Sequence, residues 1–288
     1  MRQPLSSDDS VLETARAAAL AASKRSGVEV RLLFDVDDMT AVEDLFQQVW
    51  AAGKVEHLVS RSLLRALAHS GGYVSGAFRD GVLVGASVGF LARHHGHLQL
   101  HSHISGVTPK LQGASVGFAL TQHQRAWSLD EGLDEIVWTF DPLVRMNAYF
   151  NLTKLGAGIV GYEPNFYGEM PDGINRGDES DRCLVSWQLT SSRAVAAAQG
   201  SADPVVPLRD ATVILEEDED GRPVSKDGEG RVLLAWVPQD IVEVRQHDPA
   251  LASSWRAALR GTFGDAVSDG YTATAMTRAG WYVLKKSR

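Results

Sequence analysis

The order of strands and helices expected over residues 28–190 narrows the fold more than any other feature. A β-rich run, 28–34, comes first, and apolar residues then recur at helical spacing over 37–50 and 60–69. Three successive strand patterns follow, at 73–79, 82–92 and 97–107. A helix (117–130), a strand (135–140), a helix (145–155) and two strands (159–162 and 183–189) complete the segment. Two helices before a three-strand meander and a β-α-β unit favour an α+β fold with a mixed, mostly antiparallel sheet flanked by helices.

The rest of the chain is expected to form three further parts. Residues 1–27 predict an N-terminal helical extension, and residues 191–207, rich in Ala, Ser and Pro, predict a linker. Residues 208–288 predict a C-terminal α+β lobe. Its strands at 211–216 and 231–236 flank an acidic, Gly-rich loop, two helices fit 239–247 and 250–263, and a hairpin fits 271–276 and 280–285.

Residues 107–120 carry the strongest functional signal. A strand ends at Val107, small residues fill a short turn, and a helix follows at once. Such a connection directs several backbone N–H groups and a helix dipole at one point, which is a common way to bind a pyrophosphate. Taken alone, the same residues also fit a tight turn that needs glycine for its geometry only.

The loop resembles the acyl-CoA loop of the GNAT superfamily of acyltransferases, Val-x-Pro-x-x-[Arg/Gln]-x-x-Gly-x-[Gly/Ala]. Val107, Pro109, Gln112 and Gly117 match it, and Ser115 stands where the family usually has its first glycine. The resemblance covers roughly residues 28–190 and implies a GNAT-like sheet, with acetyl-CoA or another acyl-CoA as co-substrate and no metal. It implies cofactor contacts from Gly106, Val107, Gln112, Gly113, Ala114, Ser115, Val116, Gly117, Asn147 and Asn151.

A second block is more specific. Residues 138–143 (WTFDPL), Asn147-Ala148, Asn151-Leu152 and 154–157 (KLGA) look like one GNAT subfamily described only as predicted acetyltransferases. Ser102-His103, residues 165–168 (NFYG) and residues 180–182 (SDR) fit the same subfamily. So do Trp255-Arg256, Gly270-Tyr271 and residues 282–284 (YVL), so the resemblance extends over nearly the whole chain. It implies an N-acyltransferase, of the N-acetyltransferase type, that acts on the amine of a small molecule, with amino acids among the expected acceptors.

The resemblance also implies a reaction path. The fourth strand would part from the fifth to admit the pantetheine arm, and a backbone N–H between residues 104 and 107 would stabilise the thioester oxyanion. The family usually places a proton-donating Tyr four residues before a Gly-Phe pair. Here the pair is Gly156-Ala157 and that position is Leu152, which cannot donate a proton. Either the thiolate leaves unprotonated, or another group serves. Tyr149, one turn earlier, is a candidate acid, although Tyr162 and Tyr167 are also near and each fits a packing role.

His101 and His103 are the candidate bases. Period-two alternation places both on one face of their strand, together with Ser105. Imidazoles accept protons near neutral pH, and the amine must lose one to attack. The alternative is a pair of structural histidines. Since no Cys or acidic residue lies at matching spacing, a metal site is not expected.

Three residues are candidates for binding the acceptor. Asp141 follows a strand directly, where its carboxylate either binds an amine or caps the next helix. Arg176 and Arg182 lie in a polar stretch with Asp178 and Asp181. These arginines either bind an acceptor carboxylate or form internal salt bridges.

Charge and cysteine content exclude several classes. The net charge is −8 and no five-residue basic cluster occurs, which argues against sequence-independent nucleic-acid binding. No apolar run is long enough to span a membrane, the first residues lack a signal-peptide core, and Cys183, the single cysteine, allows no internal disulfide. We therefore expect a cytoplasmic protein with Cys183 in its core.

The expected partner is a small-molecule amine, and the C-terminal lobe either covers the acceptor site or forms a homodimer. A protein acyltransferase and a catalytically silent acyl-CoA-binding regulatory module are the alternatives.

Overall fold

The computed structural model describes residues 7–50, 58–94, 96–170, 177–201 and 210–286. The chain divides into two compact units. Unit 1 comprises the described residues up to Val137 together with Gln188–Thr190, and unit 2 comprises Trp138–Trp187 and the residues from Ser191 onward. Each unit is described separately.

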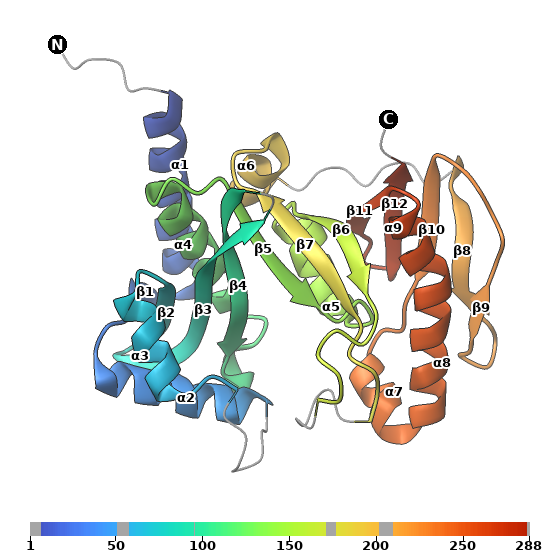
Figure 1. Cartoon of the computed structure of the whole chain (residues 1–288), viewed down its shortest axis with the longest axis horizontal. Helices are drawn as coiled ribbons and strands as arrows, with labels where there is room; N and C mark the ends of the chain where they lie inside the picture. The colour runs from blue at the N-terminus through green and yellow to red at the C-terminus, as the bar shows by residue number, and fades with distance from the viewer. Residues whose placement is uncertain (1–6, 51–57, 95, 171–176, 202–209, 287–288) are drawn as a thin grey trace. The chain divides into compact units, whose positions relative to one another are not determined.

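Unit 1 is built on an antiparallel meander (Figure 1). Strand β1 (Glu29–Leu32) pairs with β2 (Tyr73–Arg79), β2 with β3 (Val82–His94), and β3 with β4 (His97–Val107). The start of β5 (Glu135–Phe140) adds to β4 in parallel, through Leu100–Ile136 and His101–Val137. The tight turn between β2 and β3 places Asp80 and Gly81 at positive φ, which Gly and Asp tolerate better than most residues.

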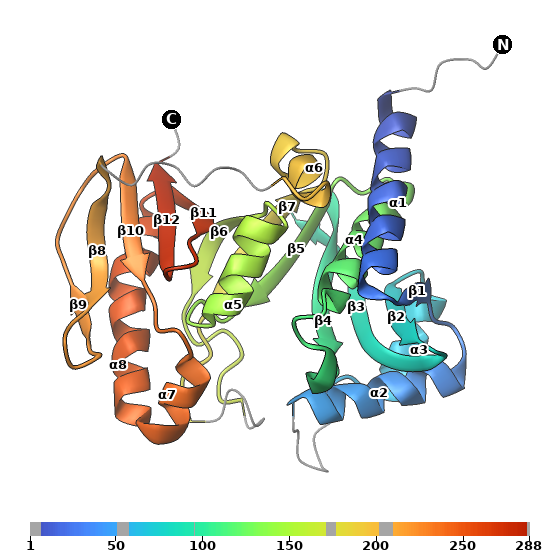
Figure 2. The same cartoon turned by 180° about the vertical axis from the view of Figure 1, so that it is seen from behind.

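Helices cover both faces of this meander. On one face, α2 (Val36–Trp50) and α3 (Arg61–His69) bury an apolar cluster that includes Met39, Phe46 and Leu64 against β2 and β3. On the other face, α1 (Ser7–Ser26) lies beside α4 (Val116–Asp130), as both views show (Figures 1 and 2). The residues packed between these two helices and the strands are mostly small, as Ala22 and Ala119 illustrate. The backbones of α1 and α4 therefore approach each other closely.

Unit 2 combines seven strands with five α-helices in its described residues. Its strand order is β7-β6-β11-β12-β10-β8-β9, all antiparallel except the β8–β10 pair. The strands are β6 (Gly158–Glu163), β7 (Arg182–Gln188), β8 (Thr212–Glu217), β9 (Pro223–Ser225), β10 (Val232–Trp236), β11 (Tyr271–Met276) and β12 (Trp281–Lys286). The helices are α5 (Arg145–Ala148), α6 (Ser192–Ala198), α7 (Ile241–His247), α8 (Pro249–Leu259) and α9 (Asp265–Ser268). Aspartates 240 and 248 cap α7 and α8 with their carboxylates, which begins each helix where the sequence pattern places it.

The α+β class with mostly antiparallel strands flanked by helices is confirmed. Three local expectations need correction. The predicted linker 191–207 contains α6, because Ser191 caps a run of alanines. The predicted acidic loop at 217–230 contains β9, which pairs with β8. The predicted helix at 145–155 passes from α5 into a π-helical turn, Tyr149–Lys154. The expected domain limits at residues 27/28, 190/191 and 207/208 stay predictions. Within the described ranges, no helix has the length and hydrophobicity that a membrane crossing requires.

Candidate active site

The loop between β4 and α4 has the geometry of an anion site. After β4 ends at Val107, a 3₁₀ turn, Pro109–Leu111, reverses the chain, and Gly113 and Ser115 adopt left-handed φ values of 82° and 63°. A β-carbon at Gly113 would meet nothing within 4 Å, and one at Gly117 would approach only the Val107 side chain, at 3.9 Å. The surface over the loop backbone is therefore open, as close approach of a phosphate requires.

The backbone N–H groups of this loop divide into two sets. Those of Leu111, Gln112 and Ala114 donate to carbonyls within the turn. In the described structure, no backbone carbonyl accepts from the N–H groups at 113 and 115–118, and the first intrahelical bond is Ala119 N–H to the Ser115 carbonyl. The left-handed backbone of Ser115 also prevents its hydroxyl from capping α4. The start of α4 thus presents unused donors and the positive end of the helix dipole at one exposed place.

A β-bulge in β4 changes which side chains share a face. Val88 of β3 is opposite Ile104 and Gly89 is opposite Ser102, so His103 is an extra residue in β4. The Ser105 hydroxyl lies 2.7 Å from that of Ser87, to which Gln124 of α4 donates. Ser105 therefore lies on the α4 face, and the prediction that it shares a face with the two histidines is wrong. Strict alternation fails because the bulge inserts one residue between 102 and 104.

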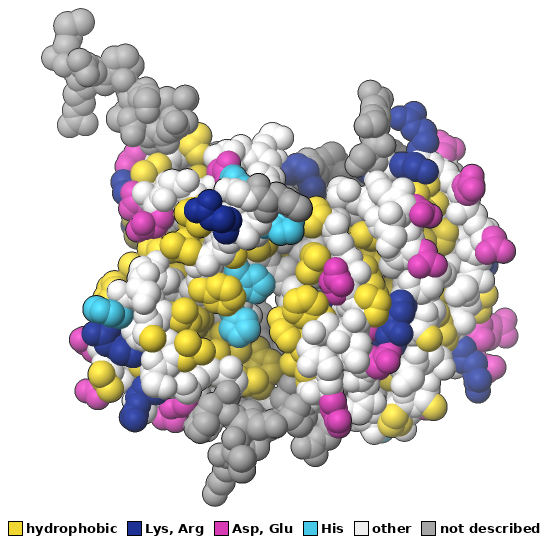
Figure 3. Space-filling model, in the orientation of Figure 1, with side chains coloured by type: hydrophobic (Ala, Val, Ile, Leu, Met, Phe, Trp, Pro, Cys, Tyr) yellow, Lys and Arg dark blue, Asp and Glu magenta, His cyan; other side chains and the backbone are white. Residues whose placement is uncertain are grey.

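His101 and His103 do lie together, on the face of the meander that α2 covers. The His101 ring stacks on Phe90 of β3 at 4.8 Å between centroids, and the His103 ring lies 6.2 Å from that of His101. Phe90 was not singled out from the sequence, although its place opposite His101 follows once β3 and β4 pair. Burial lowers the pKa of both imidazoles, and the neighbouring His103 lowers that of His101 further. Both rings are therefore neutral near pH 7 and able to accept a proton. Histidine side chains reach the surface over the strands of unit 1 (Figure 3).

The edge of β4 that faces β5 is paired only in its middle. The described parallel ladder consists of Leu100–Ile136 and His101–Val137, and no further pair in unit 1 continues it toward Val107. Residues 102–107 of β4 thus keep one row of backbone groups without a strand partner in that unit. The expectation that the fourth strand leaves its parallel neighbour before the loop stays a prediction, because β5 beyond Val137 belongs to unit 2.

Gly106, unlike the glycines of the loop, is buried, and a tryptophan ring packs against it. A β-carbon there would lie 2.7 Å from the Trp50 ring, at the end of α2. Trp50 itself packs edge-on against Phe46, at 5.6 Å between centroids. Glycine at 106 therefore lets the edge of the Trp50 indole approach the β4 backbone closely, on the α2 face of the meander.

Asp141 is taken up by an internal charge network in unit 2. Its carboxylate accepts from both terminal nitrogens of Arg256, at 2.7 and 2.9 Å, and from Arg245 at 3.2 Å, and it also accepts from the Leu143 backbone N–H. Asp178 binds the same two arginines. Burial alone would raise the pKa of Asp141, but the charges of Arg256 and Arg245 hold it below its usual value. The α7 and α8 partners of Asp141 had no sequence signal, because they lie more than 100 residues away.

The nearby polar residues extend this network. Asp181 accepts from the Tyr162 hydroxyl at 2.6 Å and from Arg260 at 2.7 Å. Arg182 is buried, donates to the Asp181 carbonyl and the Met170 sulfur, and lies over the Tyr167 ring. Arg176 lies outside the described residues. Asp178 and Asp181 thus form ion pairs with the distant Arg245, Arg256 and Arg260. Acceptor binding by Asp141, Arg176 and Arg182 stays a prediction.

The remaining candidates lie on α5 and its π-helical turn. Asn147 is exposed, whereas Asn151 is buried, because the wider π turn rotates the chain between them. Leu152 is buried, and the Tyr149 hydroxyl accepts from Arg278 Nε at 3.5 Å. Cys183 is fully buried, and burial raises the pKa of its thiol, as expected of a core residue. Within the described ranges, no three His, Cys, Asp or Glu side chains are grouped to hold a metal ion.

Comparison with known proteins gives fold relatives of low sequence identity. The chain is similar to a GNAT-family acetyltransferase of Streptococcus pneumoniae, with 13% identity over 55% of this chain and 97% of that one and a TM-score of 0.44. It is also similar to a Brucella melitensis GNAT-family acetyltransferase in complex with acetyl-CoA, with 16% identity over 40% of this chain and 76% of that one and a TM-score of 0.34. An aminoglycoside acetyltransferase from an uncultured soil metagenomic sample, in complex with sisomicin, is similar with 17% identity over 40% of this chain and 78% of that one and a TM-score of 0.36. No curated protein matches the sequence.

A family model gives the firmer result. Residues 10–142 match the model of the acetyltransferase (GNAT) domain. That segment includes the β4–α4 loop, the bulge and both histidines. The similarity to this domain covers less than half of the chain.

Proposed function

We propose that this chain is an acyl-CoA-dependent N-acyltransferase that transfers an acyl group, most simply acetyl, to the amine of a small molecule. The observation that carries the proposal is the start of α4, where unused N–H donors converge under an open surface. Gly113, Ser115, Val116 and Gly117 would hold the pyrophosphate there through their backbone N–H groups, and Gln112 and Ala114 would line the same site. Gly106 and Val107 would flank the pantetheine arm, and Asn147 and Asn151 would add side-chain contacts to it.

The thioester supplies an activated carbonyl, and the protein's task is to position the amine and remove its proton. His103 is the proposed base, because it lies at the bulge, beside the unpaired stretch of β4, with a neutral ring. His101, stacked behind it on Phe90, would orient it or share the proton. The amine nitrogen forms a bond to the acyl carbon, the carbon–sulfur bond breaks, and the thiolate leaves. A free backbone N–H of residues 104–107 would stabilise the oxyanion.

The acceptor and the proton donor to the thiolate are part of the same proposal. An amino acid is the acceptor class that the resemblance favours, with Asp141, Arg176 and Arg182 as its proposed ligands. Asp141 would have to give up a hydrogen bond to Arg245 or Arg256 to bind it. Tyr149 is the proposed acid, since Leu152 is apolar and buried. That same leucine supports a second candidate, a catalytically silent acyl-CoA-binding regulatory module.

Two measurements on the full chain separate these functions. The first is thermal unfolding with CoA, acetyl-CoA and longer acyl-CoA thioesters. The second is release of free thiol with a panel of amino acids and other amines. Binding with amine-dependent thiol release supports the enzyme, and binding without release for any amine supports the silent module. No rise in melting temperature at saturating thioester would overturn the cofactor loop itself.

A further inference from the structure

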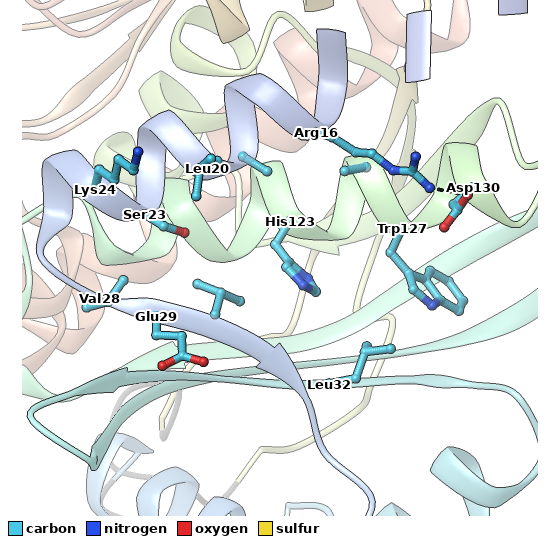
Figure 4. Close-up of a pocket in the computed structure, with 13 residues that line it drawn as sticks. Arg16, Leu20, Ser23, Lys24, Val28, Glu29, Leu32, His123, Trp127 and Asp130 are labelled. Atoms are coloured by element: carbon cyan, nitrogen blue, oxygen red, sulfur yellow. Dashed lines mark hydrogen bonds and ion pairs between the residues drawn. The ribbon is translucent and has the colours of Figure 1, made fainter. Parts of the chain in front are cut away.

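Unit 1 contains a cavity that lies away from the proposed acyl-CoA loop and the two histidines. It has a volume of about 560 Å³ and is enclosed by α1, β1 and α4 (Figure 4). The histidines lie on the α2 face of the meander, whereas this cavity lies under α1 on the α4 face. Its volume falls within the range of small-molecule sites.

The walls of the cavity are apolar. Leu20 of α1 lies at its edge with 57% of its surface exposed, and Val30 and Leu32 of β1 line the side opposite α4. His123 and Trp127 point from α4 toward β1 (Figure 4). Their rings and that of the buried Tyr73 form one aromatic cluster, with centroids 5.9 and 5.0 Å from Tyr73. The charged side chains that line the cavity are the ion pair of Arg16 with Asp130 and the exposed Lys24 and Glu29.

Besides the Ser23 hydroxyl, the uncharged polar groups that line the cavity are ring nitrogens of His123 and Trp127. Nδ1 of His123 lies 2.8 Å from the Tyr73 hydroxyl. Burial lowers the pKa of His123 to about 4 and raises that of Tyr73, so both groups are neutral at pH 7. We assign the Tyr73 hydroxyl as the donor to Nδ1, which places the imidazole hydrogen on Nε2. In the described structure, Nε2 of His123 and Nε1 of Trp127 meet no hydrogen-bond partner. An aromatic wall with two N–H donors and no buried charge suits an uncharged aromatic ligand that carries a hydrogen-bond acceptor.

We propose that this cavity binds an uncharged one- or two-ring aromatic molecule that carries a carbonyl oxygen. The ring system would lie between Trp127 and the β1 side chains, and the carbonyl would accept from Nε2 of His123. The site goes beyond the proposed acyl transfer, and its ligand need not be a substrate. Because the cavity lies along α4, a bound molecule contacts the same helix whose first turn forms the proposed cofactor loop.

The test uses two probes of nearly equal shape, acetophenone and ethylbenzene, which lacks the oxygen. Binding to the full chain is measured by thermal unfolding and by ligand-observed NMR. We expect acetophenone to bind at least about fivefold more tightly than ethylbenzene, the effect of one hydrogen bond to a partly buried donor. His123→Phe keeps the ring and removes the donor, so the two probes should then bind equally.

A blocking variant locates the binding. Leu20→Trp fills the mouth of the cavity from an exposed position and should weaken acetophenone at least about tenfold. Leu63→Trp places the same residue at an exposed position on α3, across the meander, and should leave binding unchanged. Saturating CoA should not compete. Equal binding by wild type and Leu20→Trp, or competition by CoA, would overturn the proposal, as would a concentration-dependent dimer that Leu20→Trp abolishes without any probe binding.

Discussion

Units 1 and 2 both concentrate polar residues near strand ends, but they use them in opposite ways. In unit 2, the buried charges of Asp141, Asp178, Arg245 and Arg256 satisfy one another. In unit 1, the N–H groups at the start of α4 have no acceptor in the described structure. The rings of His101 and His103 on β4 contact mainly aromatic carbon. A polar group that is saturated internally contributes to the fold, whereas one that is left open is a candidate for binding and chemistry.

The largest effect should come from breaking the saturated region. Arg256→Ala leaves two buried carboxylates short of their main partner, so we expect the free energy of unfolding to fall by about 3–5 kcal/mol. Denaturant unfolding measures it. Arg16→Ala removes an exposed pair and should leave the midpoint nearly unchanged. A small loss with Arg256→Ala would mean that the network is solvated and contributes little.

Changing the open region should affect rate rather than stability. His103→Gln should lower kcat by about 100-fold or more, the usual contribution of a general base. The affinity for acetyl-CoA and the melting temperature should stay the same. His101→Gln should lower kcat less, because that ring is stacked behind His103 on Phe90. If kcat survives both substitutions, neither histidine is the base.

Two matched charge changes test the loop, one in the first turn of α4 and a control in the first turn of α3. Gly117→Asp puts a carboxylate in the first turn of α4, where it favours the helix dipole but repels a pyrophosphate. We expect the affinity for acetyl-CoA to fall at least about tenfold, with no loss of melting temperature. Ser62→Asp makes the same change in the first turn of α3 and should leave the affinity unchanged. Equal losses in both variants would point to net charge rather than to the loop.

The pH dependence sharpens the assignment of the base. Burial lowers the pKa of His103 below its ordinary 6.5, so the neutral, active form persists to lower pH. Activity should therefore be lost as pH falls through a value below 6.5. The acidic limb of kcat for the wild type should show that midpoint, and His103→Gln should abolish the limb. A limb centred above 6.5 would contradict a lowered pKa at His103.

The smallest effect should come from Ser115. Its left-handed backbone is unfavourable for a residue with a β-carbon, so Ser115→Gly should raise the free energy of unfolding by about 0.5–1 kcal/mol. Acetyl-CoA affinity should not fall, because the backbone N–H supplies the contact. A clear loss of affinity would instead assign the serine hydroxyl to a phosphate.

Periodicity in the sequence predicted most elements, because their stabilising contacts are regular. Strands β2, β4, β5 and β11 have the predicted bounds, and the loop before α4 lies where its small residues indicated. The bulge at His103 has no sequence signal, since nothing in residues 100–106 distinguishes a bulged strand from a regular one. The partners of Asp141 and the cavity beside His123 arise from tertiary packing between distant segments, which local patterns do not encode.

Titration of acetyl-CoA into the full chain by calorimetry tests the central claim most directly. We predict saturable binding to one site per chain that weakens as salt rises, because charged phosphates are held at the start of α4. The absence of saturable binding at millimolar acetyl-CoA would contradict the assignment of this loop.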